Sequence, residues 1–171
     1  MRTAVVAGNP KPASRTLDAA TRLAAELAGQ PPDTVLDVIT LGPGLLGWGD
    51  ERVSDAVRSV AAADLVVVAS PTFKATYSGV LKLFLDQFAT GEGLRGVVAV
   101  PLMLGAGPAH ALAPDLLLKP VLVELGAITP APGLYLRDSG YATDGSIGEY
   151  AGRWGPVLRA LAALPDRAPR D

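Results

Sequence analysis

The sequence has no cysteine and a single histidine among its 171 residues. Without cysteine, the chain has no disulfide, no thiolate nucleophile, no iron–sulfur cluster and no cysteine-bound zinc. With one histidine, a transition-metal site would depend almost entirely on carboxylates, so we expect no metal site.

Long runs of one charge and long apolar runs are also missing. The formal net charge is −2 and neither sign gathers in a block, so we expect no nucleic-acid or membrane-surface partner. No stretch approaches the roughly 20 apolar residues that a membrane span needs. The apolar run before Pro10 is too short for a signal peptide. We therefore expect a soluble, cytoplasmic protein.

The chain does have enough apolar residues, 49%, to fill a substantial core. At this length it is most simply one domain over residues 1–171. The proline-rich tail 165–171 is expected to fray.

Strand-like and helix-like segments alternate along the chain. Short apolar runs typical of buried strands occur at residues 3–7, 35–41, 65–69, 97–104 and about 133–137. Helical periodicity occurs at about 14–28, 51–62, 77–88, 109–125 and 147–164. This alternation predicts an α/β fold, a three-layer sandwich with helices on both faces of a parallel sheet. Five strands favour the order 2-1-3-4-5.

Two prolines conflict with this scheme. Pro101 lies in the fourth strand, where a central position would lose a ladder hydrogen bond, so we expect a bulge or the end of the strand. Pro114 lies inside the fourth helical segment and should kink or break it.

The loop after the first strand has the composition of an anion site. Ser14 is a good N-cap, and a helix start offers unpaired N–H groups and a positive dipole end. The hydroxyls of Ser14 and Thr16 and the cations of Lys11 and Arg15 add to it. The loop predicts a site for one phosphate monoester; the alternative is a capped helix with solvated charges.

Two more loops follow predicted strands at the same edge of the sheet. In loop 70–76, Pro71 fixes the backbone, while Ala75 and Thr76 are small enough for a flat ligand to approach. Loop 104–107 contains two glycines and again exposes backbone. The three loops together predict a mononucleotide pocket, although an ordinary strand–helix turn would also explain the second.

Three linked motifs carry a resemblance to a known family. They are Gly-Asn-Pro at 8–10 with Ser-Arg-Thr at 14–16, Ser-Pro-Thr-Phe-Lys-Ala-Thr-Tyr-Ser-Gly at 70–79, and Leu-Gly-Ala-Gly at 104–107. Over about residues 2–128 the chain resembles the NAD(P)H-dependent FMN reductases, especially the flavin reductases of two-component alkanesulfonate monooxygenase systems. It departs from their usual pattern at Asn9, Phe73 and Leu116.

The resemblance implies a flavodoxin-like fold, FMN as cofactor or substrate, and NADPH or NADH as hydride donor. It also implies homodimers or homotetramers and a flavin-dependent monooxygenase as a possible partner. Ser14, Arg15 and Thr16 would hold the FMN phosphate. The implied cofactor-binding residues are Asn9, Ser14, Arg15, Thr16, Pro71, Thr72, Phe73, Lys74, Ala75, Thr76, Gly105, Ala106 and Gly107.

Such a reaction needs no catalytic acid–base pair, because the hydride passes between nicotinamide and flavin. Backbone donors over residues 73–76 would stabilise negative charge on the reduced flavin. Two alternatives stay open. One is a quinone or azo reductase with tightly bound FMN, and the other is a flavin-binding electron carrier without turnover.

Two further features have more ordinary interpretations. His110, at a helix start without an obvious partner, is expected to have a structural role. The segment 109–125 has more apolar surface than one sheet face covers, which indicates a subunit interface, or else a fully buried helix. Its apolar residues are Leu112, Leu116, Leu117, Leu118, Val121, Leu122 and Leu125.

Overall fold

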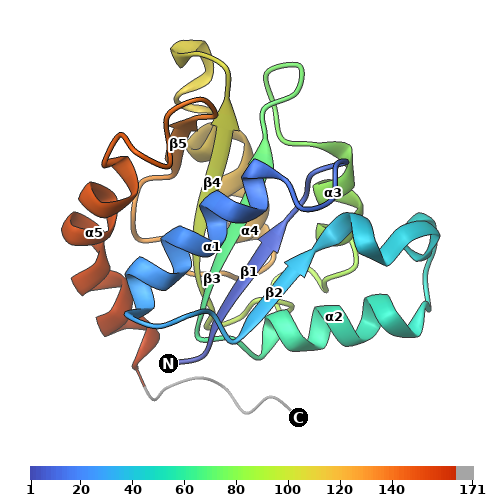
Figure 1. The fold of residues 1–171 in the computed structure, drawn as a ribbon. Coiled ribbons are helices and arrows are strands. Elements are labelled where there is room, and N and C mark those ends of the chain that lie inside the picture. The colour runs from blue at the N-terminus through green and yellow to red at the C-terminus, as the bar shows by residue number, and fades with distance from the viewer. Residues whose placement is uncertain (165–171) are drawn as a thin grey trace.

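The computed structural model, which describes residues 1–164, is built on one five-stranded parallel sheet (Figure 1). The strands are β1 (Thr3–Ala7), β2 (Thr34–Asp37), β3 (Leu65–Pro71), β4 (Val98–Gly105) and β5 (Leu134–Arg137). Their order is β2-β1-β3-β4-β5, and every neighbouring pair is parallel. This confirms the predicted flavodoxin-like order. The expectation of a frayed tail falls outside the described residues.

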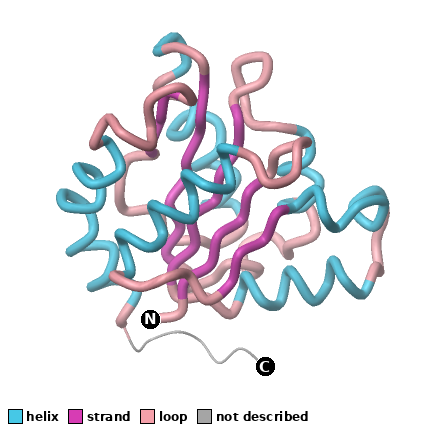
Figure 2. The backbone as a smooth tube through the Cα atoms, viewed as in Figure 1, coloured by secondary structure: helices cyan, strands magenta, loops and turns pink. Residues whose placement is uncertain are grey.

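Helices cover both faces of the sheet and make three layers (Figure 2). On one face lie α1 (Arg15–Ala28) and α5 (Ser146–Ala162). On the other lie η1 (Val38–Leu46), α2 (Glu51–Ala61), α3 (Gly79–Leu85) and α4 (Lys119–Glu124). Within residues 1–164, no helix is both long enough and apolar enough to cross a membrane.

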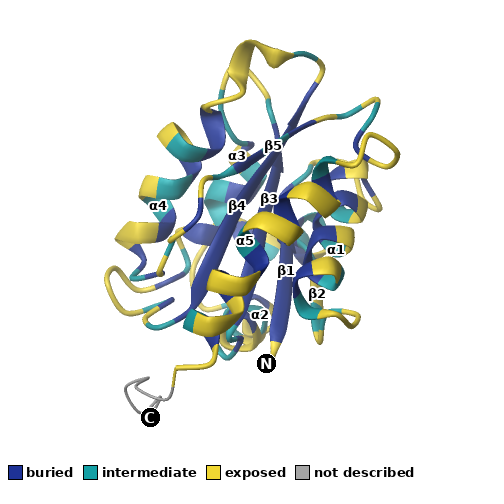
Figure 3. Cartoon of the chain, turned by 90° about the vertical axis from the view of Figure 1, so that its left-hand side faces the viewer, coloured by how far each residue is buried: buried dark blue, intermediate teal, exposed yellow. Residues whose placement is uncertain are grey.

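Each face of the sheet has its own apolar core. Along β3, Val66 and Val68 enter one core, and Leu65 and Val67 enter the other. Because successive strand residues point to opposite faces, a strand between two cores must be apolar throughout. Figure 3 shows the strands buried between helices whose outer faces are exposed.

Two predicted elements prove too long. The second strand ends at Asp37 rather than residue 41, and the chain continues as the 3-10 segment η1 with a left-handed kink at Gly42, φ 64°. The third helix starts only after Ser78, whose side chain accepts a hydrogen bond from the Leu81 amide, and it ends at Leu85. The N-cap places Tyr77 outside the helix.

The expectation that Pro101 marks a bulge or a strand end is wrong, since β4 continues through it. The Ala99 amide donates to Ile128 on the β5 side of β4. Because backbone groups alternate sides along a strand, position 101 faces that side too. β5 pairs with β4 only from Leu102 onward. Pro101 therefore lies where no neighbour needs its missing N–H.

The expected break at Pro114 is confirmed, so the continuous helix over 109–125 is wrong. The segment divides into the 3-10 turn η2 (Pro108–His110), the π-helical turn η3 (Pro114–Leu118) and α4. Proline suits the start of η3 because the first helical N–H groups have no intrahelical acceptor. Leu118 and Leu122 are fully buried, whereas Leu112 and Leu116 are about two-thirds exposed.

Gly8 lies where the end of β1 touches the start of α3. Its amide donates to the Ala69 carbonyl at 2.9 Å, and its carbonyl accepts from the Ser78 hydroxyl. A Cβ atom added here would lie 2.3 Å from the Leu81 Cβ and 2.6 Å from the Leu81 Cα. Only glycine allows this approach.

Replacing Gly8 with alanine is therefore expected to force the first loop away from α3. We expect the free energy of unfolding to fall by about 1–3 kcal/mol, the usual cost of overpacking. Urea unfolding followed by circular dichroism measures it. Gly152→Ala is the matched control: its Cβ meets nothing within 4 Å in α5, so stability should stay level or rise by up to about 1 kcal/mol. Equal effects of the two variants would contradict the packing argument.

Candidate functional site

The loops that follow β1, β3 and β4 meet at the carboxyl edge of the sheet and enclose a cavity of about 460 Å³. This is the edge where open α/β sheets bind ligands, and the volume suits a small-molecule site. The cavity is lined by Asn9, Lys11, Ala13, Ser14, Arg15, Thr16, Pro71, Thr72, Phe73, Leu104, Gly105, Ala106 and Asp138.

One end of the cavity is the N-terminus of α1. Ser14 caps this helix by accepting from the Leu17 amide at 3.3 Å. Thr16 is 2% exposed, and its hydroxyl accepts from the Asn9 side-chain amide at 3.0 Å. The amides of the first helical residues have no intrahelical acceptor. Together with the positive end of the helix dipole, they form a place for an anion.

The loop before this helix is held in a strained shape. Ala13 has φ 50°, a left-handed conformation that residues with a Cβ rarely adopt. Its amide donates to the Asp37 carboxylate at 2.8 Å, at the end of β2. This bond anchors the loop against the strain, so that the backbone curves around the cavity.

The β3–α3 loop is a tight hairpin that projects from the sheet edge (Figure 1). Phe73 and Thr76 exchange backbone hydrogen bonds of 2.8 and 3.1 Å. Lys74 and Ala75, between them, have φ of 50° and 69°. Two positive φ angles define a type I′ turn, which normally uses Asn-Gly. Because the amides of Phe73 and Thr76 donate to each other's carbonyls, the expected row of donors over 73–76 reduces to Lys74 and Ala75.

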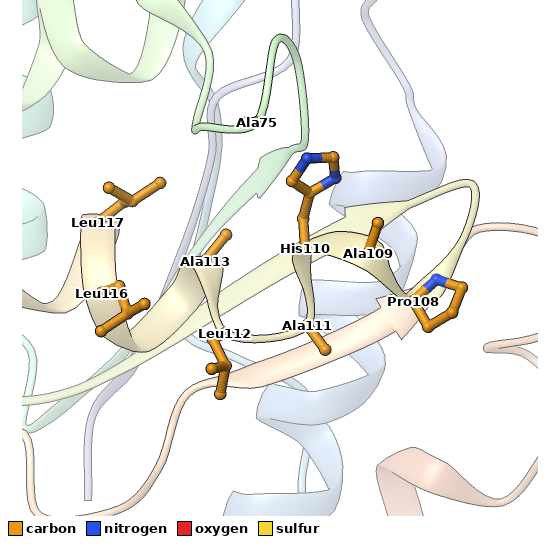
Figure 4. A pocket seen from close by; sticks show the side chains of 9 residues that line it. All are labelled: Ala75, Pro108, Ala109, His110, Ala111, Leu112, Ala113, Leu116 and Leu117. Carbon is orange, nitrogen blue, oxygen red and sulfur yellow. The ribbon is translucent and has the colours of Figure 1, made fainter.

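A second cavity of about 590 Å³ adjoins the first and shares Thr72, Gly105 and Ala106 with it. It is also lined by Lys74, Ala75, Gly107, His110 and Tyr135. A third, of about 440 Å³, continues over η2 and η3. In Figure 4 the His110 ring lies beneath the Ala75 loop, and Leu116 and Leu117 project from the helical segment beyond it. The second and third cavities share the lining residues Ala75 and His110.

The structure brings together most of the residues selected from the sequence. The first cavity is lined by Asn9, Ser14, Arg15, Thr16, Pro71, Thr72, Phe73, Gly105 and Ala106. The second adds Lys74, Ala75 and Gly107. Thr76 lines neither of these two cavities and serves instead to close the hairpin.

The wall shared by the two cavities contains a polar atom without a partner. Within residues 1–164, the buried hydroxyl oxygen of Thr72 has no hydrogen-bond partner. A buried unsatisfied polar group is costly, so such an atom beside a cavity marks a place for a ligand that can hydrogen-bond. The flavin ring, with nitrogen and oxygen atoms along its edge, fits this requirement.

The sequence analysis did not select two residues that line the cavities. Tyr135, on β5, donates its hydroxyl to the Gly107 carbonyl at 2.7 Å and so fixes the loop after β4. A Cβ at Gly105 would lie 1.9 Å from the Tyr135 hydroxyl oxygen, so any larger residue there would displace the Tyr135 side chain. Asp138 directly follows β5 and lines the first cavity. The sequence signal for Asp138 was its position directly after the fifth strand, because the carboxyl end of that strand meets the same sheet edge.

The charges around the first cavity are Lys11, Arg15 and Asp138. The Arg15 guanidinium makes an ion pair with the Asp138 carboxylate at 3.2 Å and also donates to its backbone carbonyl at 3.2 Å.

Nearby, Tyr141 donates to Asp18 at 2.9 Å. Burial, followed by this hydrogen bond, raises the pKa of Tyr141, so the phenol stays a neutral donor that ties the β5–α5 connection to α1.

The family model described as NADPH-dependent FMN reductase matches residues 1–142. The chain belongs to this family. An FMN reductase (NADPH) from Escherichia coli K12 is 46% identical over 77 residues, which cover 45% of this chain and 40% of that protein. The chain thus spans about two-fifths of the length of this curated relative.

Two relatives match over nearly the whole chain. The apo form of an NADH:FMN oxidoreductase (EMOB) superposes with a TM-score of 0.84 at 29% identity, covering 97% of this chain and 92% of the other. An NADPH azoreductase from Bacillus sp. OY1-2 is 28% identical over 154 residues, 88% of this chain and 84% of that protein.

The strained hairpin allows a test of its geometry. Replacing Lys74 with Asn and Ala75 with Gly installs the residues that a type I′ turn favours, so the free energy of unfolding should rise by about 1 kcal/mol. Urea unfolding measures it. Ala160→Gly, at an exposed position in α5, controls for the same alanine-to-glycine change and should cost about 1 kcal/mol. A hairpin variant less stable than the parent protein would refute the assigned turn.

Proposed function

We propose that this chain is an NAD(P)H-dependent FMN reductase. The observation that carries the proposal is the first cavity, which is lined by a helix N-terminus with two cations and by Thr72, whose buried hydroxyl oxygen is unpaired within residues 1–164. A phosphate at one end and a flat polar ring at the other are the two recognisable parts of FMN. Membership of the family supports this assignment.

In the proposed complex, the FMN phosphate lies against the first turn of α1, with Ser14, Arg15 and Thr16 as its ligands. Asn9 orients the Thr16 hydroxyl through the hydrogen bond between their side chains. The ring lies between the β3–α3 hairpin, residues 71–76, and the loop 105–107. The Thr72 hydroxyl and the backbone amides of the Lys74–Ala75 turn supply hydrogen bonds to its edge.

When bound, FMN supplies the redox chemistry by accepting a hydride from NADPH or NADH. The chain's own residues bind and orient. The left-handed backbone at Ala13, Lys74 and Ala75 shapes the two walls, and Tyr135 keeps the third loop in place. The second cavity, about 590 Å³, gives the nicotinamide nucleotide room beside the ring.

The proposal is tested directly by turnover. The purified protein should consume NADPH or NADH when FMN is added, as followed by the loss of nicotinamide absorbance. FAD and riboflavin serve as additional acceptors. Absence of turnover with all three flavins and both nucleotides would refute a flavin reductase.

A second candidate function is an azo or quinone reductase with tightly bound FMN, and the near full-length match to the Bacillus azoreductase favours it. This alternative predicts a yellow preparation that reduces an azo dye or quinone faster than free flavin. Tight FMN binding with negligible NAD(P)H oxidation would instead indicate an electron carrier. Comparing the acceptors at equal enzyme concentration separates the three.

We further propose that the protein acts in the cytoplasm as a homodimer or homotetramer and passes reduced FMN to a flavin-dependent monooxygenase. The exposed leucines 112, 116 and 117 support self-association, because they form an apolar surface along the third cavity. All elements from β1 to α5 pack on one sheet, which supports a single domain.

Arg15→Ala tests the phosphate assignment. Loss of a charge-assisted hydrogen bond should raise the dissociation constant of FMN about tenfold, while riboflavin, which has no phosphate, should change little. Quenching of flavin fluorescence measures both constants. Arg58→Ala, which removes an exposed arginine paired with Asp55 on α2, is the matched control. Equal weakening of FMN and riboflavin would contradict the placement of the phosphate.

A further inference from the structure

The ion pair between Arg15 and Asp138 places an acid at the proposed phosphate end of the flavin site. Both residues line the first cavity. The guanidinium that would bind a phosphate is already held by the Asp138 carboxylate at 3.2 Å and its carbonyl oxygen at 3.2 Å. The Arg15 cation that an incoming phosphate needs is thus already paired with the negative charge of Asp138.

The position of Asp138 is fixed by its backbone. Its amide donates at 3.0 Å to the carbonyl of Gly105, the last residue of β4, which also lines the cavity. Three residues further along, the Tyr141 hydroxyl is hydrogen-bonded to Asp18 on α1. Because both ends of this turn are anchored, Asp138 stays beside the cavity when its side chain releases Arg15.

The ion pair between Arg15 and Asp138 is weak enough for another anion to replace it. The Arg15 side chain is 64% exposed and that of Asp138 is 32% exposed. Exposed ion pairs contribute little, because water screens them. A phosphate dianion carries twice the charge of a carboxylate, so its charge-assisted bonds to the guanidinium are stronger. A phosphate dianion would displace the carboxylate. The cost of breaking the ion pair would reduce the binding free energy of FMN, and the acid that remains nearby would repel the phosphate.

We propose that Asp138 is an internal competitor for Arg15 that weakens the binding of the FMN phosphate and keeps the flavin exchangeable. This inference rests on the proposed function. It assigns Asp138 the role of a specificity-determining residue: it lowers the preference of the site for FMN over riboflavin, and it speeds the release of FMN, as is needed when flavin is a substrate rather than a resident group.

Asp138→Asn tests the inference, with Asp138→Ala as a second variant that also removes the acceptor. Both variants should lower the dissociation constant of FMN about fivefold and change that of riboflavin by no more than about twofold. Rapid-mixing fluorescence should show slower FMN dissociation. Asp55→Asn, which removes an exposed acid paired with Arg58 on α2, gives the same change of net charge and should alter neither flavin.

A double-mutant cycle tests whether Asp138 acts through Arg15. When Arg15 is already alanine, there is no cation to release, so Asp138→Asn should tighten FMN by no more than about twofold. Thermal melting checks that each variant is folded.

Asp138 variants with FMN affinity unchanged or weaker, or with riboflavin tightened equally, would overturn the inference while leaving the reductase proposal intact. If the parent protein binds neither flavin and oxidises no NAD(P)H, the proposed function itself fails.

Discussion

The contact between Gly8 and the start of α3 is the constraint on which the site depends. The Ser78 hydroxyl donates to the Gly8 carbonyl, and the Ser78 amide donates to the Ser70 hydroxyl at 2.8 Å. Ser70 and Ser78 are almost fully buried, so these bonds lack competition from water. They join the end of β1 to both ends of the β3–α3 hairpin. The anion end and the ring end of the cavity are therefore held at a fixed separation.

The chemistry assigned to the site is carried mainly by backbone. In the part of the chain that the structure describes, the non-glycine residues with positive φ are Ala13, Lys74 and Ala75, and all three lie in the site loops. Strain of this kind is kept only where the surroundings enforce it. Here the anchors are Asp37 for the first loop and the Phe73–Thr76 pairing for the second. Charge has a secondary role: the Arg15–Asp138 ion pair adjusts how strongly the proposed phosphate is bound.

Local patterns predicted much of the fold and of the site. The bounds of β1 and the N-cap Ser14 agree with the structure, because an unbroken apolar run and a capping serine are local signals. The length of β2 and the tolerance of Pro101 depend on what lies beside each strand, which sequence periodicity does not report. Asp138 and Tyr135 were missed for the same reason: their partners, Arg15 and Gly107, are far away in the chain.

The central claim is that the cavity at the carboxyl edge holds FMN with its phosphate at the start of α1. A crystal structure of the protein with FMN tests it most directly. The account predicts phosphate oxygens within hydrogen-bond distance of the first-turn amides and the Ser14 and Thr16 side chains, with Arg15 turned from Asp138 toward the phosphate. The ring should lie against the hairpin, in reach of the Thr72 hydroxyl. A phosphate bound elsewhere, or a ring outside this cavity, would contradict the account.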